Sequence, residues 1–400
     1  MTATPDWHSM RADAQGPLRR GTSATDAPRR RRRRWPIAVA AIAGAVTVAA
    51  CATFETVDYY WQGAAGQWDL ISRSQPIPDV IDKSDAALAE RLKRIREIRA
   101  FASRELGLPD NGSYTRYTDL GRPFVTWNVF ATPELSMAPR QWCFPIAGCV
   151  NYRGYFREHE AQVEQTRLKS IGDDVYVGGV PAYSTLGWFD DPVLSSFVRW
   201  PETEIARLIF HELAHQLLYV KSDSLFNESF ATAVEEAGLA RWLATRNDPQ
   251  LATQAERSNR LRAKFRELVR STRTKLYELY ASSMSDDDKR RRKAETIAAM
   301  KAAYETAKAG EPGLSGYDRW FAQQPNNAAL AAVGIYTDRV PAFRELLHET
   351  DGNLPKFYER VREMAAWSKR TRDARLDQLA ARAAAATMSA QHTPSDRAAD

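Results

Sequence analysis

The chain has no net charge once its first 50 residues are set aside. Residues 1–50 hold nine arginines and no lysine against three aspartates and no glutamate, which gives +6, and the formal net charge of the whole chain is also +6. Residues 51–400 are therefore formally neutral. Nucleic-acid binders present a basic surface, so the composition gives no support for a nucleic-acid partner.

Cysteine is scarce, and long hydrophobic runs are nearly absent. The cysteines are Cys51, Cys143 and Cys149. Cys143 and Cys149 enclose only FPIAG, which in an exported chain favours a disulfide that closes a small loop. Zinc binding by these two is the weaker alternative, because the usual second pair of cysteines is missing. The apolar stretch WPIAVAAIAGAVTVAA, over 35–50, is short and alanine-rich for a membrane span.

A leader segment is indicated by what surrounds this apolar stretch. Six consecutive arginines at 29–34 precede it, and VAAC follows, with Cys51 as its last residue. A basic segment, a short apolar segment and small residues before a cleavage point are typical of a secretory signal. VAAC also resembles the bacterial lipobox, whose cysteine is lipidated. We therefore predict a lipid anchor at Cys51 in the bacterial cell envelope, facing the periplasm; since Ala52 follows the cysteine, the outer membrane is favoured. A single spanning anchor is the alternative, and Met10 is an alternative start.

Histidine is also rare, with six in the chain, and two of them lie in HELAH at 211–215. The flanks ETEIARLIF and QLLYV have helical spacing of apolar residues. His211 and His215 then share one helix face and can converge on one metal at about 2.1 Å. Glu228, in NESFA at the start of a second apolar-periodic run, is the expected third ligand, and the fourth position stays open for water. The alternative is a helix whose histidines pack or face solvent.

The residue types predict one Zn²⁺ ion as cofactor, although the same donors accept other divalent ions. Glu212 would act as general base on a zinc-activated water. Glu235, seven residues after Glu228, could orient a histidine or bind a substrate amine, but an exposed helix carboxylate is the favoured interpretation. The reaction also needs an oxyanion donor, for which the candidates are Tyr183, Tyr219 and Tyr336.

The pattern along the chain predicts an α+β fold that is mainly helical. A small β-sheet precedes the HELAH helix, since Ser113–Phe156 is rich in Thr, Tyr, Val, Phe and Trp. Asp174–Thr185 is expected at the edge of that sheet, where an extended peptide could pair with it; the equally weighted alternative is an ordinary edge blunted by Pro181. A long, charged helical hairpin, 254–308, follows. The aromatic residues of 52–72 are interpreted as core, because polar residues interrupt them.

Six segments are expected in this order. They are a leader over 1–50, N-terminal helices over 51–110, a mixed α+β catalytic core over 111–250, the charged hairpin over 251–310, C-terminal helices over 311–379 and a loose tail over 380–400. The tail is predicted because its alanine-rich and then polar sequence has no periodic apolar face.

Several segments resemble the bacterial family of predicted zinc-dependent aminopeptidases, many of which are lipoproteins. The resemblance extends from about Cys51 to Tyr358 and is carried by CATFETVDYYWQGAAGQWDLI, WCFPIAGCVNYRGYF, GGVPAYSTLGWFDDP, HELAH with NESFA, and NNAALA with VPAFRELL. It implies a gluzincin-like metallopeptidase with His211, His215 and Glu228 as ligands and Glu212 as base. Twelve residues separate His215 from Glu228, fewer than in the better-known gluzincins, and the GAMEN-type stretch of the larger aminopeptidases is missing.

Three functions follow from these observations. The first is an envelope aminopeptidase that acts on peptides and meets the membrane through its lipid anchor. The second is an envelope endopeptidase, and the third is a non-enzymatic envelope scaffold with a vestigial metal site and the charged hairpin as a docking arm.

Overall fold

The computed structural model describes residues 57–145, 147–182 and 184–392. The expected leader, the lipidation candidate Cys51 and the oxyanion candidate Tyr183 lie outside these residues. The chain from Tyr59 onward forms one compact unit. Within the described residues, no helix combines the length and the apolar character needed to cross a bilayer.

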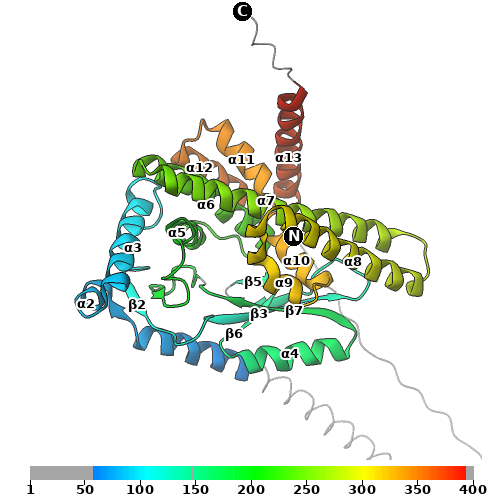
Figure 1. Cartoon of the computed structure of the whole chain (residues 1–400), viewed down its shortest axis with the longest axis horizontal. Coiled ribbons are helices and arrows are strands. Elements are labelled where there is room, and N and C mark those ends of the chain that lie inside the picture. Colours follow the sequence, from blue (N-terminus) through cyan, green and yellow to red (C-terminus); the bar gives the residue numbers. More distant parts are fainter. Residues whose placement is uncertain (1–56, 146, 183, 393–400) are drawn as a thin grey trace, which may run out of the picture. The chain divides into compact units, whose positions relative to one another are not determined.

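The fold is α+β and mainly helical, as the sequence predicts (Figure 1). Residues 59–72 are helical. The labelled helices are α2 (Ile77–Ile81), α3 (Ala86–Arg104), α4 (Glu158–Ser170), α5 (Glu202–Leu217), α6 (Ser224–Arg246), α7 (Pro249–Ala281), α8 (Asp286–Gly310), the 3-10 helix η1 (Pro312–Tyr317), α9 (Asp318–Ala322), α10 (Asn327–Ile335), α11 (Val340–Glu349), α12 (Leu354–Ala365) and α13 (Lys369–His392). The strands are β1 (Gln75–Pro76), β2 (Arg116–Thr118), β3 (Thr126–Pro133), β4 (Trp142–Phe144), β5 (Gly148–Val150), β6 (Arg153–Tyr155), β7 (Asp173–Val180) and β8 (Val193–Leu194).

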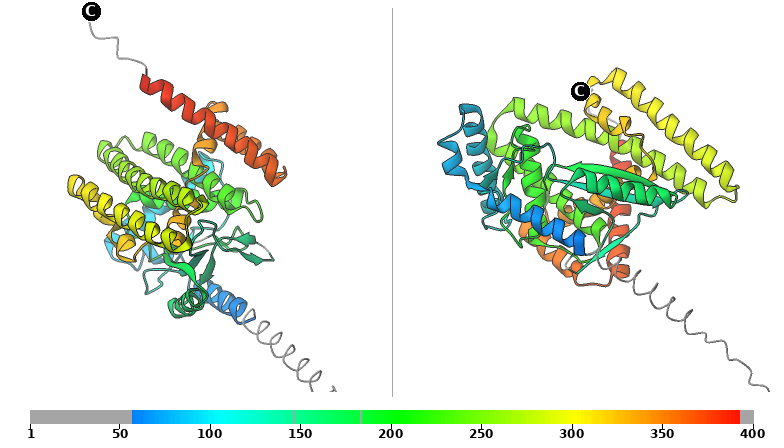
Figure 2. Two further views of the ribbon diagram at one scale, coloured as in Figure 1. Left: turned by 90° about the vertical axis from the view of Figure 1, so that its right-hand side faces the viewer. Right: turned by 90° about the horizontal axis from the view of Figure 1, so that it is seen from below.

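The strands form small sheets, of which the antiparallel sheet β6-β3-β7 is central to the site. Side chains alternate between its faces. Trp127, Val129 and Ala131 of β3 pack with α4 below the sheet (Figure 1, Figure 2), whereas Phe130 packs with α10 on the other face. β7 lies at the edge of this sheet, which confirms the sequence-based expectation.

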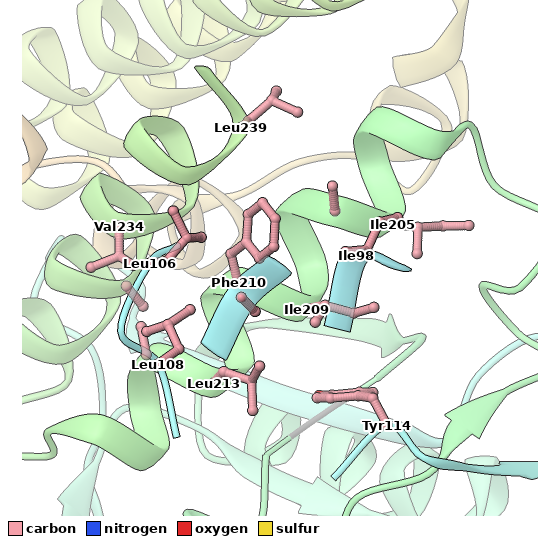
Figure 3. Packing of buried hydrophobic residues seen from close by; sticks show 14 of the residues in the cluster. Ile98, Leu106, Leu108, Tyr114, Ile205, Ile209, Phe210, Leu213, Val234 and Leu239 are labelled. Atoms are coloured by element: carbon pink, nitrogen blue, oxygen red, sulfur yellow. The ribbon is translucent and has the colours of Figure 1, made fainter. Parts of the chain in front are cut away.

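α5 and α6 pack side by side and carry the HELAH and NESFA segments. α5 begins after Pro201, and its first turn holds Glu202 and Glu204, whose carboxylates face the positive end of the helix dipole. Its apolar face enters the main core, with Phe210 fully buried near Leu106 (Figure 3). α6 begins at Ser224 and is capped by Asp223, whose side chain accepts a hydrogen bond from the N–H of Phe226.

Gly238 sets how closely α6 approaches α5. A Cβ atom at this position would lie 2.7 Å from the side chains of Leu106 and Phe210, closer than van der Waals contact permits. Glycine therefore lets α6 approach α5 closely, and this approach brings the side chains of α6 within reach of the histidines.

The charged hairpin is formed by α7 and α8, close to the predicted boundaries. Ser285 caps α8 by accepting a hydrogen bond from the N–H of Asp288, as its place before three aspartates predicts. One face of the hairpin is buried, because residues of both helices form a second core with η1 and α9. This core includes Phe265, Val269, Leu276, Met300 and Tyr304.

The predicted loose tail from residue 380 is wrong over 380–392, because α13 continues to His392. The alanines and arginines that lack an apolar period are nevertheless strong helix formers. Leu376 and Leu379 anchor the helix in the main core, and Arg382 pairs with Glu345 and Glu349 of α11. Residues 393–400 lie outside the described part of the chain.

The interpretation of the 52–72 aromatics as core is also wrong in part. Trp61 and Trp68 are each 72% exposed, and Tyr60 is 44% exposed. The helix packs through its other face, where Leu70 is buried in the main core and Gly66 lies against the ring of Phe156. Helical periodicity places the two tryptophans seven residues apart on the outer face.

Candidate metal centre

The structure brings His211, His215 and Glu228 together from α5 and α6. The Nε2 atoms of the two histidines are 3.2 Å apart. The Oε2 atom of Glu228 lies 3.2 Å from Nε2 of His211 and 3.5 Å from Nε2 of His215. The three side chains are nearly buried, with 8% to 12% of their surface exposed. They form a group that could hold a metal ion.

The spacing of these three atoms fits a divalent cation. Nitrogen and oxygen ligands at about 2.0–2.2 Å from a tetrahedral zinc ion are separated by about 3.4 Å. The observed separations of 3.2 Å, 3.2 Å and 3.5 Å agree with that value. Two neutral imidazoles whose Nε2 lone pairs face each other and a carboxylate would repel in a dry site. A cation between them removes this repulsion.

The negative charges of Glu228 and Glu235 around His211 also favour a cation in the cluster. Burial lowers the pKa of His211, but the carboxylates of Glu228 and Glu235 more than offset this and shift it upward. Burial raises the pKa of Glu228, and the histidines outweigh burial, so that its pKa falls to about 2. Without a metal, a proton on His211 would hold the carboxylates together; a divalent ion can replace it.

Glu235 orients His211, so the preference for an exposed helix carboxylate is wrong. Its Oε2 atom lies 2.9 Å from Nδ1 of His211, and its side chain is 12% exposed. A hydrogen on Nδ1 donated to this carboxylate leaves the lone pair on Nε2, which is the tautomer a metal ligand requires. Nδ1 of His215 is buried and has no hydrogen-bond partner within the described residues.

Arg207 forms an ion pair with Glu235. Its Nη1 atom lies 3.2 Å from Oε1 of Glu235, and its Nη2 atom donates to the side-chain oxygen of Asn259. The residue is only 5% exposed, so this ion pair is little screened by water. Sequence reasoning missed Arg207, although its position four residues before His211 places both on one face of α5.

Glu212 lies on the same helix as the histidines but outside the group that could hold a metal. Burial raises its pKa above the ordinary value, although His211 and His215 act in the opposite direction. A carboxylate with a raised pKa accepts a proton more readily near neutral pH, which suits a general base.

Two of the three tyrosine candidates lie near the cluster. The ring of Tyr336 is 6.5 Å from the ring of His211, and the charge of Glu228 is the largest cause of the rise in its pKa. Burial and then Glu228 raise the pKa of Tyr219, but its hydroxyl donates to the carbonyl of Ala147. Thr232 contacts Tyr336 through the backbone carbonyl of the tyrosine, at 3.4 Å.

A further tyrosine at the site, Tyr152, escaped the sequence reasoning. It lies in the loop between β5 and β6 and packs with Phe130, and burial followed by the charge of Glu228 raises its pKa. Its segment, WCFPIAGCVNYRGYF, is one of those that carry the family resemblance, but nothing in its spacing indicates proximity to Glu228. Cys143 and Cys149 in this segment form a disulfide.

A polar network near Glu212 was also not predicted from the sequence. Gln216, one turn after Glu212, donates from Nε2 to Oδ2 of Asp191 and to Oγ of Ser113, each at 3.1 Å. Burial raises the pKa of Asp191 to about 7, and Glu212 adds to the rise. The buried hydroxyl of Tyr114 has no partner within the described residues, and burial and then Glu212 raise its pKa.

The fold and this centre define a mainly helical α+β protein with a His-His-Glu cluster and an adjacent carboxylate. A family model described as "Putative aminopeptidase" matches residues 58–376, most of the chain, and the chain belongs to this family. Membership supports a peptidase function. No curated protein and no solved structure matches the chain.

Proposed function

We propose that the chain is a zinc-dependent aminopeptidase of the bacterial cell envelope. The observation that carries the proposal is the convergence of His211, His215 and Glu228 at ligand spacing beside the half-buried Glu212. A zinc ion held by these three residues would supply a Lewis acid that polarises the scissile carbonyl and acidifies water.

Glu212 carries the proton in this proposal. Its raised pKa lets it accept a proton from the attacking water and then deliver that proton to the nitrogen of the leaving amine. Glu235, held by Arg207, fixes the ring of His211. The hydroxyl of Tyr336 or of Tyr152 stays protonated at neutral pH, because the raised pKa disfavours the phenolate. Either can therefore donate to the developing oxyanion.

A peptide substrate can dock along the outer edge of β7. The carbonyl of Val180 accepts a hydrogen bond from the N–H of Val125, just before β3, whereas that of Val175 points away from β3 and accepts one from the side chain of Asn326. Since the pattern alternates, the backbone groups of Val177 and Gly179 also point outward. Val175, Val177 and Gly179 line a groove of about 600 Å³. Tyr176, which also lines the groove, packs in the cluster that contains Tyr152 and Tyr336.

The test compares the wild-type chain with Glu212→Gln on a peptide library, after both are loaded with zinc. We expect Glu212→Gln to keep the metal and to lose activity by about 10²-fold to 10⁴-fold, the usual contribution of a general base. Glu236→Gln is the matched control, since Glu236 pairs with Arg344 away from the histidines. Equal activity of the Glu212 variant and the wild type would refute the role of Glu212.

Amino-terminally acetylated peptides distinguish the two peptidase hypotheses. An aminopeptidase leaves them intact and releases single residues from free peptides, whereas continued cleavage would assign endopeptidase activity. The envelope location, with a lipid anchor at Cys51, is part of the proposal and is tested by mass spectrometry of the mature amino terminus.

A further inference from the structure

The helix over 59–72 presents a firmly held aromatic face to solvent. Its inner face is fixed by several contacts: the Thr118 hydroxyl donates to the carbonyl of Leu70, the Phe156 N–H donates to Gln62, and Tyr59 stacks on Phe144. The outer face cannot rotate inward without breaking these contacts. The exposure of this face is therefore built into the fold.

The outer face carries Trp61 and Trp68, each 72% exposed, with Ala64 and Ala65 exposed between them and Tyr60 beside them. Seven residues along a helix correspond to about 10 Å, so the two indoles lie about two turns apart in one row. Single exposed apolar residues are common, but a row of large aromatic side chains on one face marks a contact surface.

The neighbouring helix α4 also exposes apolar side chains. Figure 1 and Figure 2 show the helix over 59–72 and α4 along the same face of the molecule, below the sheet. α4 buries Ala161 and Leu168 against that sheet and leaves Val163 56% exposed, and Ile171 at its end is 60% exposed. Apolar side chains are thus exposed along both helices.

Indole rings favour one environment in particular. Tryptophan and tyrosine are amphipathic and concentrate at the headgroup level of membranes, where the ring is in an apolar medium and its N–H or O–H stays hydrated. The row on this helix contains no lysine or arginine, so its attraction to lipid would come from the rings and not from anionic headgroups.

The sequence places the proposed anchor close to this face. Tyr59 is eight residues after Cys51, and eight residues span at most about 28 Å when fully extended. A lipidated Cys51 would hold the start of this helix within that distance of the bilayer. This short tether favours contact with the membrane over contact with a protein partner, because it keeps the helix near the bilayer.

We propose that the face formed by Tyr60, Trp61 and Trp68 rests in the headgroup region of the phospholipid membrane to which Cys51 is anchored. The contact would hold the peptidase unit in one orientation on the membrane. The inference rests on the lipid anchor of the proposed function and not on its zinc chemistry.

The test uses the mature lipidated protein, purified from membranes and reconstituted in phosphatidylethanolamine and phosphatidylglycerol vesicles. Lipids brominated near the headgroup quench only those tryptophans that contact them. We expect quenching in the wild type and loss of most of it in Trp61→Phe/Trp68→Phe. Trp188→Phe is the matched control, because Trp188 is 66% exposed elsewhere in the chain, and it should be quenched like the wild type.

Equal quenching in the double variant and the wild type would overturn the proposal, as would the absence of quenching in the wild type. Protection of these tryptophans from acrylamide without quenching by brominated lipid would assign the face to a contact between copies of the chain, and would also overturn the proposal. Peptide hydrolysis is measured in parallel. If the double variant loses quenching but keeps full peptidase activity, the membrane contact and the zinc chemistry are tested independently of each other.

Discussion

Replacing Glu235 by glutamine should weaken metal binding without removing any metal ligand. The glutamine carbonyl can still accept the hydrogen on Nδ1 of His211, over the present distance of 2.9 Å, but it carries no charge. The imidazole becomes a weaker donor, and the affinity should fall about 10-fold to 100-fold, or about 1.4–2.7 kcal/mol. The glutamate is only 12% exposed, so water cannot replace the lost charge.

The same substitution leaves Arg207 without its carboxylate. Breaking a buried ion pair costs about 3–5 kcal/mol, and the amide oxygen, which can still accept a hydrogen bond, should reduce this to the lower part of that range. The free energy of unfolding therefore needs to be measured by urea denaturation beside the affinity. Glu235→Gln should shift both quantities, and circular dichroism checks that the variant is folded when the metal is titrated.

Competition between the metal-free protein and a fluorescent zinc chelator gives the affinity. Glu236→Gln is the matched control, because this neighbouring glutamate is 22% exposed and pairs with Arg344 and Arg266. Its zinc affinity should equal that of the wild type. Equal affinities for the Glu235 and Glu236 variants would refute the assignment of Glu235 to His211.

Three further substitutions test the surroundings of the centre. Gly238→Ala should lower the free energy of unfolding by about 1–3 kcal/mol through overpacking, whereas Gly310→Ala, in open space, should leave it unchanged; equal urea midpoints would contradict this. Cys143→Ser should cost about 2 kcal/mol and expose the β4–β5 hairpin to limited proteolysis, and an unchanged digest would count against it. Burial raises the pKa of Asp191 from 3.8 to about 7, so the folded protein retains a proton that the unfolded chain releases. Stability therefore falls as pH rises from about 4 to about 7, and Asp191→Asn should remove this slope in metal-free urea titrations; an unaltered slope would contradict it.

The ligands of the centre were predictable because they are local. His211 and His215 are one helical turn apart, and Glu228 opens the next helix, so helical period and ligand chemistry are sufficient to select them. The hairpin helices α7 and α8 follow from their helical sequence pattern, and the start of α8 follows from the cap at Ser285.

The residues that complete the centre were not predictable from pattern. Tyr114, Tyr152 and Asp191 come from loops, where no period marks which side chain turns inward. Glu235 was identified as a candidate, but its burial depends on the close approach of α6 and α5 at Gly238. Only tertiary packing decides that approach.

Trp61 and Trp68 were predicted to be buried but are exposed. Aromatic residues bury well, so Trp61 and Trp68 were assigned to the core. Their seven-residue spacing places both on one face, but spacing alone does not say whether that face turns inward. The contacts of Leu70 and Gly66 turn it outward.

Anomalous diffraction at the zinc absorption edge, from crystals of the zinc-loaded protein, tests the central claim most directly. The account predicts one peak, about 2.1 Å from Nε2 of His211, Nε2 of His215 and a carboxylate oxygen of Glu228, with Glu212 outside ligand distance. No peak between these three side chains, or a peak to which Glu228 does not contribute an oxygen, would contradict it.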